Sequence, residues 1–172
     1  MKNVMRAAAV AAAIVMFGSV AEAQQKWASF TPPDGGYRVD VPTSPSVKSG
    51  DTKTDYGPAH VVEAVFKMSD GLDCTIRRAD YEAGAIGLDP QGHFNRVKQN
   101  FAAKYSIRSD DRQALINQPA MHLVVDLPNK RVARFQEVII ADRTITMVCI
   151  VPAGQETGPT MKRIFSSFAV IK

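Results

Sequence analysis

Cysteine, aromatic residues and an excess of charge of one sign are all scarce in this sequence of 172 residues. It has 2 Cys, 8% aromatic residues, and 21 Lys and Arg against 17 Asp and Glu, which gives a formal net charge of +4. Two cysteines exclude a small scaffold stapled by many disulfides. With 45% hydrophobic residues and only 11 Gly and 10 Pro, the chain is neither collagen-like nor disordered. The remaining class is a globular protein with an apolar core.

The sequence also lacks the short motifs that mark common enzyme sites. It contains no GxSxG elbow, no HExxH pair, no GxGxxG fingerprint and no Walker loop. The adjacent carboxylates Asp110 and Asp111 are expected to point to opposite sides of an extended chain, so they form a poor acid–base pair. Local spacing therefore predicts no catalytic residue and no cofactor site, and it favours a non-catalytic protein.

The longest apolar run lies near the start of the chain and predicts a secretory signal peptide over residues 1–23. Its three parts are a positive start with Lys2 and Arg6, an apolar run over 7–17, and a small-x-small cleavage site at 21–23. We expect cleavage between Ala23 and Gln24. A permanent transmembrane anchor is the weaker alternative, because spanning a bilayer takes about 20 apolar residues. The sequence thus predicts a periplasmic or secreted protein without a stable membrane anchor.

Residues 24–172 are expected to form a single domain. Removing 23 residues leaves 172 − 23 = 149, and the loss of two basic and one acidic residue leaves a net charge of 19 − 16 = +3. This mild charge, together with export, argues against nucleic acid as a partner. The basic pairs at 77–78, 130–131 and 162–163 lie far apart in the sequence, and we interpret them as solvated.

Apolar residues alternate in several segments and repeat at helical spacing in two others. The sequence predicts strands over 37–42, 60–68, 72–81, 121–125, 131–141 and 144–151, and helices over 89–105 and 159–168. Residues 43–57 read as a loop or a weak edge hairpin, and 108–118 as a polar approach to the next strand. Strands outnumber helices and do not alternate with them, so we predict an α+β fold whose central, largely antiparallel sheet is covered by two amphipathic helices.

The helix predicted over 89–105 has the clearest signals. Phe94, Val97 and Phe101 fall at spacings of three and four on one face. Asp89 is placed as an N-cap, and Pro90 follows at the first helical position, where its missing N–H costs nothing.

Two parts of the sequence resemble small exported bacterial proteins of the PsbP-like class. These are the opening segment, with Trp27 and the run FTPPDGGYRVDVP over 30–42, and the closing segment IFSSF over 164–168. The resemblance implies an α/β/α sandwich with a central antiparallel sheet. Photosynthetic members of that class assist an oxygen-evolving complex. This sequence has no metal-binding or partner-binding motif that matches theirs, so the resemblance assigns no functional residue here.

Cys74 and Cys149 are candidates for a disulfide. Both fall in predicted strands among apolar neighbours, and export would place them in an oxidising compartment. Their sequence positions leave two alternatives open, a bond between them or two separate buried thiols. The pair is not a CxxC motif, which argues against a thioredoxin-like redox role.

The three histidines show no spacing typical of a metal site. We expect His60 and His93 at the surface and His122 half-buried and hydrogen-bonded. The interpretation that follows is a non-catalytic periplasmic module that binds a protein, an envelope component or a small ligand. The alternative is an enzyme whose residues converge from separate strands, with His122, Asp126 and Arg134 within hydrogen-bond reach of one another.

Overall fold

The structure is a computed structural model that describes residues 26–86 and 89–171. The predicted signal peptide, with its cleavage point between Ala23 and Gln24, lies outside the described residues. The described elements are, in chain order, β1 (Ala28–Phe30), β2 (Tyr37–Val41), β3 (Ser46–Thr54), β4 (Gly57–Lys67), β5 (Asp73–Tyr81), α1 (Pro90–Ala102), β6 (Ser106–Asp111), β7 (Ala120–Leu127), β8 (Arg131–Ile140), β9 (Arg143–Pro152), α2 (Pro159–Ser167) and β10 (Ala169–Val170).

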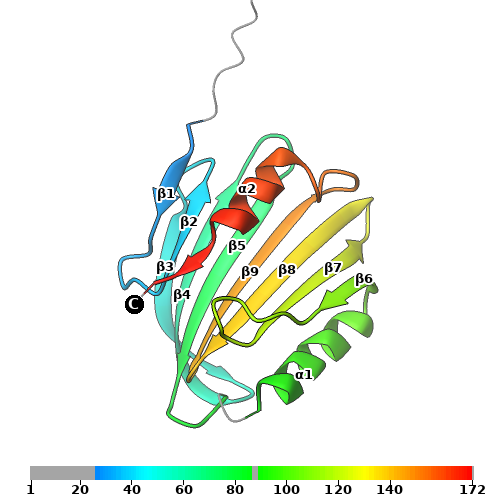
Figure 1. The fold of residues 1–172 in the computed structure, drawn as a ribbon. Helices are drawn as coiled ribbons and strands as arrows, with labels where there is room; N and C mark the ends of the chain where they lie inside the picture. Colours follow the sequence, from blue (N-terminus) through cyan, green and yellow to red (C-terminus); the bar gives the residue numbers. More distant parts are fainter. Residues whose placement is uncertain (1–25, 87–88, 172) are drawn as a thin grey trace, which may run out of the picture.

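A large antiparallel sheet forms the centre of the fold (Figure 1). Its strand order is β3-β4-β5-β9-β8-β7-β6, so it consists of two meanders, β3 to β5 and β6 to β9, joined where β5 pairs with β9. The turns between strands carry the strain that tight hairpins require: Asn129 and Lys130 have positive φ between β7 and β8, and Ala141 has positive φ between β8 and β9. The predicted antiparallel sheet is confirmed.

The layer on one face of this sheet differs from the prediction. A second sheet of order β1-β2-β10 lies there beside α2, as Figure 1 shows, so β2 is not part of the central sheet. The prediction that two helices cover the sheet is therefore right only in part, because on this face α2 shares the cover with the small sheet. The physical reason is size: α2 has only 9 residues, and the fully buried side chains Tyr37, Val39 and Val41 of β2 cover apolar surface that α2 leaves open.

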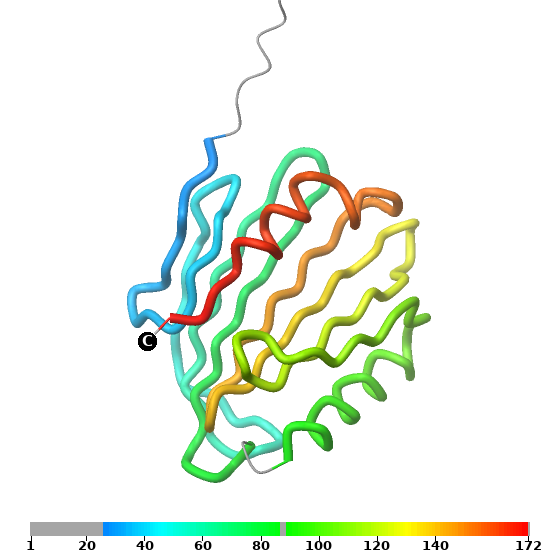
Figure 2. The backbone as a smooth tube through the Cα atoms, viewed as in Figure 1, coloured from blue at the N-terminus to red at the C-terminus, as the bar shows by residue number. Residues whose placement is uncertain are grey.

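Alternating side chains of the large sheet form two cores, one on each face. On the α2 face, Ile76 and Met147 pack with Ile164 of α2 and with Tyr37. On the opposite face, Leu123 and Phe135 pack with Phe94, Val97 and Phe101 of α1. The tube in Figure 2 shows α1 running alongside the edge strand β6. Asp89 caps α1 as predicted, since its Oδ1 accepts a hydrogen bond of 2.8 Å from Gly92 N.

The two edge strands were poorly predicted because neither has an apolar face. Residues 43–57 contain β3, a long edge strand that pairs with β4, so the loop reading is wrong and the edge hairpin is right. Residues 108–118 contain most of β6, which the sequence did not predict as a strand. Charged edge strands protect a sheet from pairing with other chains, and their polar sequences hide the alternation that identifies a strand.

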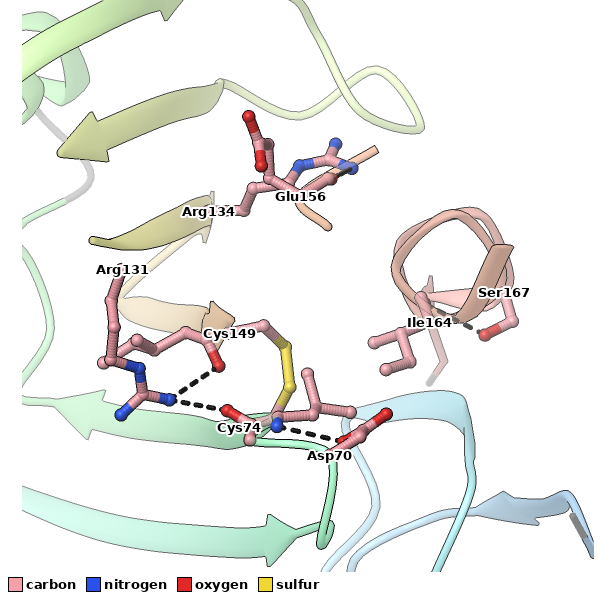
Figure 3. Close-up of a disulfide and its surroundings, with 11 residues drawn as sticks. Asp70, Cys74, Arg131, Arg134, Cys149, Glu156, Ile164 and Ser167 are labelled. Carbon is pink, nitrogen blue, oxygen red and sulfur yellow. Dashed lines mark hydrogen bonds between the residues drawn. A yellow bond between two sulfur atoms is a disulfide. The ribbon is translucent and has the colours of Figure 1, made fainter. Parts of the chain in front are cut away.

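Cys74 and Cys149 are direct partners across β5 and β9, with their Cα atoms 4.1 Å apart. Their sulfur atoms are joined in a disulfide, drawn in yellow in Figure 3, and both residues are fully buried. Of the two alternatives that the sequence left open, the structure has the bond. It ties the two meanders together at their junction.

Candidate functional site

A pocket of about 220 Å³ lies on the α1 face of the large sheet. Its walls come from α1, from β5, β8 and β9, and from the turn between β3 and β4, so segments far apart in the sequence meet in it. The sheet contributes Glu137 and Thr146 to its lining, α1 contributes His93 and Arg96, and the turn contributes Tyr56. This pocket combines a concave shape with a group of convergent polar side chains, and it is our candidate functional site.

A chain of four hydrogen-bonded side chains forms the polar part of the pocket. His93 Nε2 lies 2.9 Å from Glu137 Oε2, and His93 Nδ1 lies 2.8 Å from the Tyr56 hydroxyl. The Thr146 hydroxyl donates to Glu137 Oε1 at 2.8 Å. His93 is only 8% exposed and Glu137 only 5%, so both polar groups of this pair are buried and both have partners.

Strand register explains how this chain is assembled. Arg77, Thr146 and Glu137 are direct partners across β5, β9 and β8, and they form one lateral row on the α1 face. His93 lies in the first turns of α1, and the cap at Asp89 fixes where that helix begins. A carboxylate on an inward-facing strand position needs a hydrogen-bond partner, and His93 of α1, which packs on this face of the sheet, is that partner.

The hydrogen bonds define what each group can do. One tautomer satisfies every contact: a proton on His93 Nε2 is donated to a Glu137 carboxylate, which only accepts hydrogen bonds, and Nδ1 accepts from the Tyr56 hydroxyl. Burial raises the pKa of Tyr56 above its ordinary value of 10.0; Arg96 acts in the opposite direction, and Glu137 adds to the increase. The hydroxyl therefore stays protonated at neutral pH, which suits a hydrogen-bonding group better than a nucleophile.

His93 was wrongly predicted to lie at the surface. Two sequence signals pointed to the site: His93 stands four residues before Val97 on the apolar stripe of α1, and Glu137 occupies a strand position between the inward-facing Phe135 and Ile139. Each signal alone is weak. Only the packing of α1 on β8 shows that the two side chains meet.

The other sequence-predicted residues lie on the opposite face of the sheet. His122, Asp126 and Arg134 share that face, but no hydrogen bond between any two of them occurs in the described part of the chain. Asp126 pairs with Arg108, and Arg134 donates to the Glu156 carbonyl at 3.2 Å; Figure 3 shows Arg134 beside Glu156. The prediction that these three residues form one hydrogen-bonded group is therefore wrong. Asp126 and Arg134 bond to other residues, and His122 has no hydrogen bond in the described residues.

The other two histidines and one of the basic pairs have different environments. His122 is half-buried as predicted but makes no hydrogen bond within the described residues; burial lowers its pKa, Asp111 opposes this change, and Arg134 adds to it. His60 is exposed, as predicted, with Nδ1 2.8 Å from Asp51 Oδ1. The interpretation of the basic pairs as solvated is wrong for Arg78, which is 4% exposed and donates to the Asp34 carbonyl at 2.9 Å.

Across 26–86 and 89–171, no three His, Cys, Asp or Glu side chains are close enough to hold a metal ion. No helix in that part of the chain is both long and apolar enough to cross a membrane.

Comparison with solved structures identifies the class of fold. The solution structure of cyanobacterial PsbP (CyanoP) from Synechocystis sp. PCC 6803 matches with a TM-score of 0.55 and 12% sequence identity, covering 90% of this chain and 99% of that chain. The sequence matches no family model and no curated protein. The protein therefore has a PsbP-like fold, in agreement with the resemblance of its opening and closing segments. A fold alone does not determine what binds to it.

Proposed function

We propose that the protein is an exported, non-catalytic binding module that takes a small ligand into the pocket between α1 and the large sheet. The observation that carries the proposal is the pocket's polar chain: Tyr56, His93, Glu137 and Thr146 bond to one another, so they form a fixed polar wall. A preformed wall of this kind lowers the entropy cost of holding a ligand.

Export is supported by the disulfide as well as by the predicted signal peptide. Disulfides persist in oxidising compartments outside the cytoplasm, and here both cysteines of the described chain are paired. We expect the protein in the periplasmic fraction to begin at Gln24. N-terminal sequencing of that fraction tests this, and a mature protein that still begins at Met1 would contradict it.

The pocket itself can be tested by blocking it from its rim. Asn100 lines the pocket from an exposed position on α1, and its neighbour Gln99 is exposed but does not line it. Asn100→Trp should close the pocket without disturbing a core, and Gln99→Trp is the matched control. Each protein is purified from the periplasm, and small molecules that co-purify are detected by native mass spectrometry.

We expect the unmodified protein and Gln99→Trp to carry the same small molecule and Asn100→Trp to lose it. Equal retention by both variants would show that the ligand binds elsewhere. An unmodified protein that carries no small molecule under several growth conditions would overturn the proposal.

A further inference from the structure

Resting on the proposed function, we infer that the ligand of this pocket is a small organic acid whose carboxylate is held between the guanidinium groups of Arg77 and Arg96. Arg77 projects from β5 and Arg96 from α1, so the two cations approach the pocket from the sheet wall and from the helix wall. Both residues are exposed and both line the pocket, so solvent reaches them.

These two arginines share a feature that most of the other described arginines lack, which is that their guanidinium groups have no ion-pair or hydrogen-bond partner. Neither has an ion pair or a hydrogen bond in the described residues; Arg96 makes one contact, in which its guanidinium carbon lies 5.1 Å from the centre of the Tyr56 ring. Every other described arginine except Arg38 has an ion pair or a hydrogen bond, and those arginines are Arg78, Arg108, Arg112, Arg131, Arg134, Arg143 and Arg163. Two of the three unpaired guanidinium groups therefore line one pocket.

The acidic groups of the pocket form no ion pair with these cations in the described residues. Glu137 lies at the buried end and accepts hydrogen bonds from His93 and Thr146, so its carboxylate is already satisfied. Asp55 is exposed in the turn between β3 and β4 and forms no ion pair in the described chain. The pocket thus holds two guanidinium groups that pair with neither of its carboxylates, and their donors are free to bind the carboxylate of a ligand.

The chemistry of the site favours a carboxylate over a phosphate. A guanidinium group binds two oxygens of a carboxylate or of a phosphate with two parallel hydrogen bonds, so the distinction rests on the other donors of the site. Phosphate sites commonly use backbone N–H groups at a helix N-terminus, but at α1 the Asp89 carboxylate already occupies that position by accepting from Gly92 N. The pocket therefore offers side-chain donors in place of a backbone cradle.

The size and walls of the pocket restrict the rest of the ligand. At about 220 Å³ it is below the range of roughly 300–1,000 Å³ that holds drug-sized molecules. Val97 and Ala79 give it apolar surface, and Tyr81 adds an aromatic ring. A short apolar body attached to one carboxylate fits these walls, with the acid group at the two arginines and the body inside.

The test titrates the full mature chain with four probes, followed by the NMR signals of Tyr56, Arg96 and Thr146. Benzoate and butyrate are the carboxylates, benzamide is the neutral isostere, and inorganic phosphate is the alternative oxyanion. The variants are Arg77→Gln and Arg96→Gln. Arg38→Gln is the matched control, because Arg38 is also exposed and unpaired but lies on β2, outside the pocket.

We expect at least one carboxylate to bind, with a loss of about tenfold or more in affinity on replacing either pocket arginine, because each replacement removes charge-assisted hydrogen bonds to the ligand. Arg38→Gln should bind as the unmodified protein does, and benzamide should bind at least tenfold more weakly than benzoate.

Three results would overturn the inference. If benzamide binds as tightly as benzoate and Asn100→Trp blocks both, the pocket does not distinguish a charged ligand from a neutral one. Only the carboxylate assignment then fails. If phosphate binds as tightly as the carboxylates and depends equally on both arginines, the site recognises oxyanions in general. If no carboxylate binds, the assignment fails, and the co-purification experiment then decides separately whether the pocket binds any ligand.

Discussion

Removing the Cys74–Cys149 disulfide should destabilise the protein by about 4–5 kcal/mol. The bond closes a loop with a sequence separation of 75 residues. In the chain-entropy model such a loop removes about 15 cal/mol/K from the unfolded state, which at 25 °C is about 4.5 kcal/mol. The native β5–β9 pairing keeps its backbone hydrogen bonds without the bond, so the reduced protein should still fold.

The variant for this test is the double replacement Cys74→Val and Cys149→Val, which keeps apolar, β-branched side chains at two fully buried strand positions. Urea unfolding of the oxidised protein, the reduced protein and the variant measures the loss. For a domain of this size it corresponds to a decrease of about 10–18 °C in Tm. The variant's own stability should not respond to reductant. The reasoning is refuted if reduction costs less than about 1 kcal/mol, or if alkylation of the oxidised, unfolded chain labels both cysteines.

Three further predictions concern buried and half-buried polar groups. His93→Ala should lower the free energy of unfolding in urea by about 3–5 kcal/mol, because it leaves the buried carboxylate of Glu137 without its main partner. Adding Glu137→Leu should restore much of the lost stability. A double variant as unstable as the single one would count against a coupled pair. Burial lowers the pKa of His122 from its ordinary 6.5, so the unfolded state takes up a proton before the native state does, and stability should fall as the pH decreases below about 7. His122→Gln should flatten this slope relative to His60→Gln, and equal slopes in both variants would contradict the assignment. The buried hydroxyl of Tyr37 has no hydrogen-bond partner in the described residues, so Tyr37→Phe should raise the free energy of unfolding by about 1–2 kcal/mol, whereas a loss of that size would mean that the hydroxyl is satisfied.

The sequence alone determined the parts of the fold that depend on local periodicity. The apolar stripe and the cap at Asp89 predict α1 to within a few residues, and alternation predicts the central strands. These signals are readable because a strand or helix with one buried face must repeat its apolar residues with its own period. The resemblance of residues 30–42 and 164–168 to PsbP-like proteins agrees with the fold found.

Only the tertiary structure decided which strands pair and which polar side chains meet. Alternation in β2 shows that one face is buried, but the same pattern suits the large sheet and the covering layer equally. Cys74 and Cys149 could be assigned to a bond only once β5 and β9 were known to be in register. The same holds for the pocket, because His93 and Glu137 are 44 residues apart in the sequence. The free energy that brings them together comes from packing α1 on the sheet, and local spacing does not show which strand positions α1 will contact.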